Sequence, residues 1–95
     1  RMFFGCTSLT KLNLSSFDTS NVSSMMQMFQ GCSRLTSLDL RSFDTFKVST
    51  NSRNYSTMFN ELPNITQILV TRDKWTIPPS ADIFNGSGVT GFTYL

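Results

Sequence analysis

The side chains of this chain that could do chemistry are six carboxylates and two cysteines, and the sequence has no histidine. Asp18 and Asp44 lie 26 residues apart in two nearly identical stretches. Two carboxylates about 5–5.5 Å apart could hydrolyse a glycoside, and a row of carboxylates could contribute to a Ca²⁺ site. Each aspartate, however, stands in an S-F-D-T tetrapeptide, where its side chain can accept a hydrogen bond from the backbone N–H two residues on. We therefore expect turn-forming aspartates, no enzymatic activity and no metal site.

The two cysteines, Cys6 and Cys32, are also equivalent in these two stretches. Stacked strands lie about 4.8 Å apart, and a disulfide accepts Cα separations of about 4.4–6.8 Å. The pattern leaves a disulfide open, but two small buried thiols in neighbouring units are the expectation. Two Cys without His supply too few ligands for a zinc site, and no cofactor is expected.

Charge and hydropathy exclude two classes of partner. The net charge is only +2, and the basic residues are scattered, whereas a nucleic-acid interface needs a clustered basic face. No apolar run approaches the roughly 20 residues that span a bilayer. We expect neither nucleic-acid binding nor membrane insertion by this chain.

The candidate residues must be positioned by a sequence repeat. MFFGCTSLTKLNLSSFDTSNVS begins at Met2 and MFQGCSRLTSLDLRSFDTFKVS begins at Met28, with 14 of 22 aligned positions identical. Weaker copies begin at Met58 and Ile83. A period between 20 and 50 residues is typical of stacked supersecondary units. We expect one domain over 1–95, with units of approximately 2–27, 28–57, 58–82 and a partial 83–95, cut from a longer protein.

Each unit contains an L-x-x-L-x-L motif. The last two apolar positions of this motif are two residues apart, as on one face of a strand. We expect the middle positions to stack as successive rungs; they are Leu12, Leu38, Ile68 and Phe92. The polar residues between them should face solvent. The candidate binding residues on that exposed strand face are Thr10, Lys11, Asn13, Thr36, Ser37, Asp39, Thr66 and Gln67.

The connection back to the next strand is expected to be a short helix. The i, i+3, i+4, i+7 spacing of one helical face occurs at Val22, Met25, Met26 and Phe29. A glycine such as Gly31 suits the left-handed residue after a helix end.

Three departures from the repeat carry expectations of their own. Glu61 replaces the glycine in the third unit, so a different turn is expected there. The insertion 49–57 is expected to be a surface loop on the helix side. Trp75 is expected to replace the missing Phe in the core.

A strand, turn, helix and turn in each unit predict parallel strands. The expected fold is therefore α/β, a leucine-rich-repeat solenoid of about 3.5 repeats with a parallel sheet on one side and short helices on the other. One coil buries too little apolar surface to stand alone, so its neighbours must share their faces.

The motif M-F-x-G-C-S-x-L-T-x-L-x-L-S-x-F-D-T-S-x-V, matched from Met2 to Val22 and from Met28 to Val48, resembles the BspA-like leucine-rich repeats of bacterial surface proteins. The resemblance covers about half of the chain closely. It implies secretion, display on a bacterial cell surface, and adhesion or host contact. It brings no catalytic motif.

We therefore expect a non-enzymatic cell-surface repeat module that contacts a host or matrix protein or a glycan. The alternative is a structural spacer that projects another domain from the cell surface. Uncovered strands at the ends of the stack would favour a homo-oligomer through edge strands.

Overall fold

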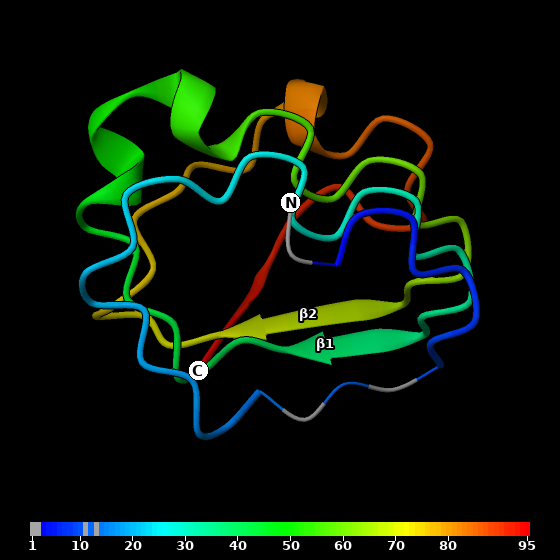
Figure 1. Ribbon diagram of the computed structural model, residues 1–95, viewed down its shortest axis with the longest axis horizontal. Helices are drawn as coiled ribbons and strands as arrows, with labels where there is room; N and C mark the ends of the chain where they lie inside the picture. The colour runs from blue at the N-terminus through cyan, green and yellow to red at the C-terminus, as the bar shows by residue number, and fades with distance from the viewer. Residues whose placement is uncertain (1–2, 11, 13) are drawn as a thin grey trace.

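The computed structural model describes residues 3–10, 12 and 14–95. Its sheet has three parallel strands in the order β1 (Ser37–Asp39), β2 (Gln67–Val70) and β3 (Thr93–Tyr94). Two successive parallel strands need a crossover that returns the chain to the end of the sheet where the first strand began. The sheet runs along one side of the molecule, and the crossovers close over the opposite side (Figure 1). The parallel sheet expected from the sequence is therefore present.

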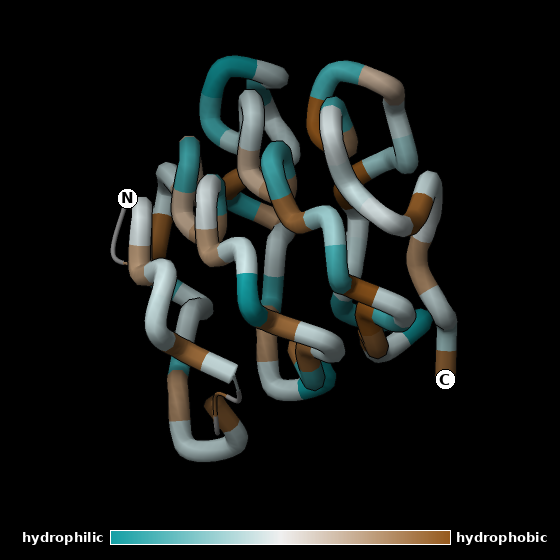
Figure 2. The backbone as a smooth tube through the Cα atoms, turned by 90° about the vertical axis from the view of Figure 1, so that its right-hand side faces the viewer, coloured by the Kyte–Doolittle hydropathy of each residue, from teal (hydrophilic) through white to brown (hydrophobic). Residues whose placement is uncertain are grey.

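Apolar side chains of neighbouring units meet on the inner face of the sheet. Leu38 pairs with Ile68 in the β1–β2 register, and both are 1% exposed. Phe92, which precedes β3, and Leu12 are half-buried and pack against the same core. The expected stacking is confirmed for Leu38 and Ile68 by their pairing. Seen from the side in Figure 2, successive turns of the chain lie next to one another from the N-terminal to the C-terminal end.

A row of four stacked phenylalanines fills the core behind the sheet. The ring centroids of Phe3 and Phe29 are 5.6 Å apart, those of Phe29 and Phe59 5.8 Å, and those of Phe59 and Phe84 5.8 Å. These three pairs are nearly parallel, with interplanar angles of 7°, 8° and 14°. Offset aromatic pairs contribute roughly 0.5–1.5 kcal/mol beyond their area burial. The row ties all four units together.

The predicted helix over Val22–Phe29 is wrong. The chain there forms turns, Met26 is 38% exposed, and Gln27 has a left-handed φ of 58° that no α-helix contains. The structure contains no α-helix among the described residues.

Alternate backbone N–H groups of this segment bond to the next unit, whereas Met28 and Gln30 between them donate to residues three positions back. The donor–acceptor pairs are Met25–Asn54 (2.6 Å), Gln27–Ser56 (3.1 Å), Phe29–Met58 (3.1 Å) and Gly31–Asn60 (3.1 Å). The same pattern joins the first unit to the second, at Phe3–Met28 (2.9 Å) and Gly5–Gln30 (2.8 Å). Buried backbone donors need partners, and here the neighbouring unit supplies them.

The helical segments that do form are 3-10 helices: η1 (Val48–Thr50), η2 (Ser52–Tyr55) and η3 (Ala81–Ile83). Two of them lie in or beside the insertion 49–57, on the side away from the sheet, as Figure 1 shows. The insertion does project on that side as expected, but it is not an irregular loop. Val48 and Tyr55 anchor it because both side chains are buried.

The turn at Glu61 does not differ from its counterparts, contrary to expectation. Its φ of 60° matches those of Gly5 (69°), Gly31 (79°) and Gly86 (77°). Its N–H donates to Asn85 (2.8 Å), in the same pattern as Gly31 to Asn60. The stacking of the units therefore imposes a left-handed conformation on a residue that disfavours it.

Trp75 takes a core position, as expected. It is 4% exposed, and its ring centroid lies 4.9 Å from that of Phe92 and 6.2 Å from that of Phe59. The connection 71–82, which lacks the S-F-D-T tetrapeptide, is therefore fixed by an indole in place of a phenyl ring.

Candidate functional site

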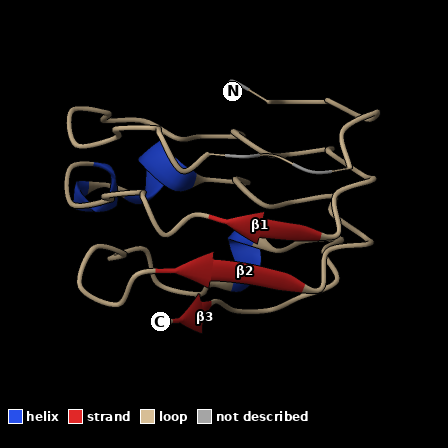
Figure 3. Cartoon of the chain, turned by 90° about the horizontal axis from the view of Figure 1, so that it is seen from below, coloured by secondary structure: helices blue, strands red, loops and turns tan. Residues whose placement is uncertain are grey.

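The exposed face of the sheet carries the candidate residues in rows. Ser37 lies opposite Gln67 in the β1–β2 register, and Thr36 and Thr66 directly precede them. All four side chains are exposed, whereas Leu38 and Ile68 next to them are buried. Because successive side chains of a strand point to opposite faces, Ser37 and Gln67 share the outer face. Figure 3 shows the three strands side by side from this direction.

One hydroxyl of this face already has a structural role. The Thr66 Oγ1 donates to the backbone oxygen of Thr36 (2.9 Å), which also accepts the Thr66 N–H (2.8 Å). Thr66 therefore fixes the start of β2 to the preceding unit. Of the predicted residues on or beside β1 and β2, those with hydroxyl or amide side chains left for recognition are Thr36, Ser37 and Gln67.

At the carboxyl end of β1 the sequence places an ion pair. The Arg41 Nε donates to Asp39 Oδ1 (2.9 Å) and its Nη2 to Asp39 Oδ2 (2.7 Å). Both groups are about half exposed, at 54% and 45%, so the pair orients the two side chains more than it stabilises the fold. Its two parallel bonds hold the guanidinium and the carboxylate in one plane.

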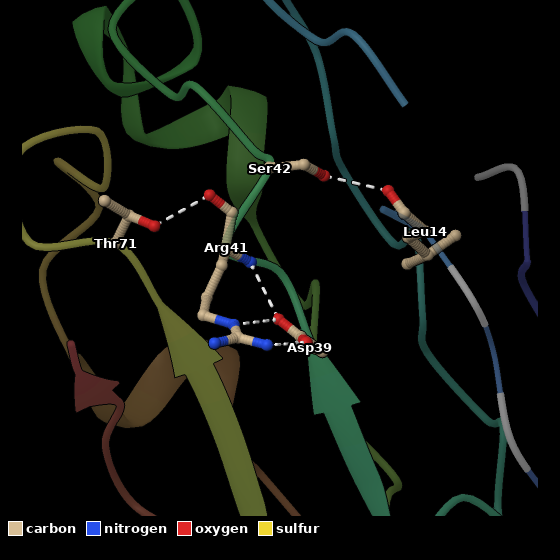
Figure 4. Close-up of polar contacts among 5 residues, drawn as sticks. All are labelled: Leu14, Asp39, Arg41, Ser42 and Thr71. Carbon is tan, nitrogen blue, oxygen red and sulfur yellow. Dashed lines mark hydrogen bonds and ion pairs between the residues drawn. The ribbon is translucent and has the colours of Figure 1, made fainter. Parts of the chain in front are cut away.

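Two hydroxyls attach this corner to the units on either side, as the close-up in Figure 4 shows. Ser42 Oγ donates to the Leu14 backbone oxygen (2.8 Å), and Thr71 Oγ1 donates to the Arg41 backbone oxygen (2.7 Å). An open hollow of about 310 Å³ lies beside the ion pair and is lined by Ser15, Asp39, Arg41 and Ser42.

The ion pair sets the electrostatics of the corner. Hydrogen bonding to Arg41 holds the pKa of Asp39 below its usual value, and the same pair raises the pKa of Arg41. Asp39 is therefore charged at neutral pH and acts as an acceptor, not as a general acid.

Six of the eight predicted site residues lie in the described part of the structure. Thr36, Ser37, Asp39, Thr66 and Gln67 lie together on or beside β1 and β2. Thr10 is exposed in the first unit, where no strand is assigned to the described residues. Lys11 and Asn13 lie outside the described residues.

Sequence reasoning missed three residues of the corner, namely Arg41, Ser42 and Thr71. The signal for Arg41 was present, because it follows Asp39 by two positions and so falls on the same side of the chain. Nothing in the sequence indicated that Ser42 and Thr71 would bond to backbone oxygens of neighbouring units.

The repeat-equivalent aspartates form the predicted turns. Asp18 Oδ1 accepts the Ser20 N–H and Asp44 Oδ1 accepts the Phe46 N–H, each at 3.0 Å. Hydrogen bonds from the Ser20 hydroxyl and N–H lower the pKa of Asp18. In the described part of the chain, no group of three or more His, Cys, Asp or Glu side chains is gathered as metal ligands would be.

Two further hollows lie on the side opposite the sheet, between the insertion and η3. Their volumes are about 330 and 610 Å³, and both are lined by Ser56 and Asp82. Arg53 and Tyr55 line the smaller one. This region offers a matched control surface for experiments on the strand face.

Among the described residues, no helix has the length and apolar character of a membrane span.

Comparisons with known proteins place the chain in a family but assign it no activity. No curated protein and no solved structure matches it. A family model described as "Mycoplasma protein of unknown function, DUF285" matches residues 1–88, nearly the full length of 95 residues. The chain therefore belongs to the DUF285 family.

Proposed function

We propose that this chain is a non-enzymatic interaction module of a bacterial cell surface, and that it contacts a host or matrix protein or a glycan through its strand face. The observation that carries the proposal is the register of β1 and β2, which sets exposed Ser37 beside exposed Gln67 on the outer side of a sheet whose inner side is core. A flat array of hydroxyl and amide groups suits a hydrogen-bonding partner such as a sugar or a peptide backbone.

We infer that the units are coils of a BspA-like leucine-rich-repeat solenoid. The stacked phenylalanines and the hydrogen bonds that join equivalent positions of neighbouring units support this inference. Such arrays present a continuous surface built from one or two residues per repeat. The resemblance of the repeat motif to bacterial surface proteins supports secretion and cell-surface display, which protease treatment of intact cells tests by removing the exposed chain.

The binding test uses a triple variant that removes side chains without a structural bond. Thr36→Ala, Ser37→Ala and Gln67→Ala leave the Thr66 hydroxyl and the Asp39–Arg41 pair in place. The parent chain is first screened on immobilised glycans and on extracellular-matrix proteins, which separates the two partner classes. Loss of three hydrogen bonds of about 0.5–1.5 kcal/mol each should weaken binding of the partner at least about tenfold.

The control variant carries Arg53→Ala and Asp82→Ala on the opposite side, and its affinity should equal that of the parent. If the triple variant binds as tightly as the parent, the strand face is not the binding site. If the parent binds neither class of partner, the chain serves as a spacer that projects another domain.

We also propose that copies of this chain associate through an edge strand. Both residues of β3 are exposed. Among the described strands, β3 is the last in the sheet order and pairs with β2 along one edge. Tyr94 and Leu95 expose 36% and 57% of their surface beside that edge. An exposed strand edge is a template for pairing, so sedimentation velocity should show a dimer whose fraction rises with concentration; a monomer at every concentration would exclude this association.

A further inference from the structure

Two cysteines of neighbouring units lie side by side at the corner that precedes the sheet. Cys6 follows Gly5 and Cys32 follows Gly31, and the two glycines have similar left-handed φ values of 69° and 79°. A Cβ built on Gly31 would lie 3.5 Å from the Gly5 Cα. Because a carbon–carbon bond is about 1.5 Å long, the two glycine Cα atoms are within about 5 Å of each other.

The two turns keep this spacing at the cysteines because their backbone hydrogen bonds are the same. Cys6 N–H bonds to Phe3 (3.1 Å) as Cys32 N–H bonds to Phe29 (3.2 Å). The next two bonds correspond in the same way: Thr7–Gly5 with Ser33–Gly31, both at 2.8 Å, and Leu9–Cys6 (3.3 Å) with Leu35–Cys32 (3.1 Å). Because the two turns are alike, we infer a similar Cα separation at the cysteines, and disulfides accept separations of about 4.4–6.8 Å.

The Cys32 sulfur itself is located beside Cys6. The Phe3 carbonyl oxygen accepts the Cys32 S–H (2.8 Å) and also the Cys6 N–H (3.1 Å). One oxygen therefore holds the thiol of the second unit against the backbone of the first. Both cysteines are free in this structure.

We propose that Cys6 and Cys32 form an oxidisable dithiol, which a small-molecule disulfide closes to a crosslink between the first two units. The Cys6 thiolate attacks the disulfide RS–SR, which forms the Cys6–S–SR bond and releases one RS⁻. The Cys32 thiolate then attacks the Cys6 sulfur and releases the second RS⁻, which takes up a proton as the first does. The protein loses two protons and two electrons, and the small-molecule disulfide is reduced to two thiols.

Exposure determines the order of the two steps. Cys6 is half-buried, whereas Cys32 is 0% exposed. Burial raises the pKa of the Cys32 thiol, which lowers its thiolate fraction and makes it a poor first nucleophile. Cys6 therefore meets the oxidant and Cys32 resolves the mixed disulfide.

The experiment treats the reduced chain with oxidised glutathione, quenches free thiols by alkylation and measures intact mass. Tryptic cleavage at Lys11 and Arg34 places the two thiols on separate peptides. The expected product is a monomer that has lost two hydrogens and whose peptides 2–11 and 12–34 are linked. The effective concentration of the pair, measured in glutathione redox buffers, should be at least about tenfold higher in the folded chain than in urea, since folding holds the sulfurs together.

Two variants test the order of the steps. Cys32→Ser should stop at a glutathione adduct on Cys6, and Cys6→Ser should react more slowly than the parent because its remaining thiol is buried. The proposal is overturned if the parent keeps the adduct on Cys6, leaves both thiols unreacted or forms an intermolecular disulfide. It is also overturned if folding gives no gain in effective concentration, which would show that the native geometry opposes the bond.

Discussion

The left-handed residue Glu61 allows a direct test of how strongly the stack dictates local backbone conformation. Its φ of 60° lies in a region that costs a non-glycine residue roughly 1–2 kcal/mol. Glycine removes that cost but loses about 0.5–1 kcal/mol through the greater freedom of its unfolded chain. Glu61→Gly should therefore raise the free energy of unfolding by about 0.5–1 kcal/mol.

The assay is urea unfolding at neutral pH, followed by thermal unfolding. For a domain of this size, a gain of 0.5–1 kcal/mol corresponds to a rise in Tm of about 2–8 °C. The slope of the free energy against urea concentration should not change, because the same surface is exposed on unfolding.

Two further variants separate the backbone from the side chain. Glu61→Ala removes the carboxylate but keeps a Cβ, so its stability should stay within about 0.5 kcal/mol of the parent. Gly31→Ala makes the opposite exchange at the equivalent position of the second unit. Its new Cβ would make ordinary contacts, at 3.5 Å or more, so its loss of about 1 kcal/mol should come from the backbone alone. A Glu61→Gly variant no more stable than Glu61→Ala would refute the reasoning.

Three other outcomes follow from contacts between units. Thr45→Val should destabilise by about 1–3 kcal/mol in urea unfolding, because the buried Thr45 hydroxyl bonds to the Lys74 oxygen and the Thr76 N–H, whereas Thr45→Ser should retain most of the stability. Gly88→Ala should cost about 1–3 kcal/mol, because its Cβ would fall on the Ile65 backbone oxygen and lie 3.1 Å from that of Pro63; an unchanged Tm would contradict this. Because the pKa of Asp39 is lowered in the folded protein, its carboxylate stabilises the fold above the unfolded pKa near 3.8. This stabilisation is lost as the pH falls through the folded pKa. Asp39→Asn should thus cost only a few tenths of a kcal/mol at pH 7, because the pair is half exposed, and this cost should shrink as the pH is lowered through the folded pKa. A loss of the same size at every pH would exclude the ion pair as the cause.

The strands and turns of this protein could be predicted because their signals are local. The alternation around Leu38 and Ile68 fixed which side chains face inward, and the position of Asp44 in its tetrapeptide indicated the hydrogen bond to the Phe46 N–H. Much of the strand face follows from the same alternation. These features depend on neighbours one or two residues away in the chain.

The crossovers could not be predicted from local spacing. The apolar spacing from Val22 to Phe29 is typical of a helix, yet the N–H of Met25 bonds to Asn54, 29 residues further along the chain. Glu61 likewise takes the conformation of the glycines beside it because its N–H must reach Asn85. The partners of Ser42 and Thr71 are also backbone atoms of other units, which no pattern within one unit reveals.

The hydrogen bonds opposite the sheet give the stack a polarity. At the Phe and Gly positions, each unit donates its N–H groups forward and offers its carbonyl oxygens to the unit before it: Phe3 to Met28, Phe29 to Met58 and Phe59 to Ile83. Like a filament with distinct ends, such an array extends only when each added unit has the same direction. A unit exchanged between such proteins must therefore match donors on one flank and acceptors on the other, whatever its surface residues recognise.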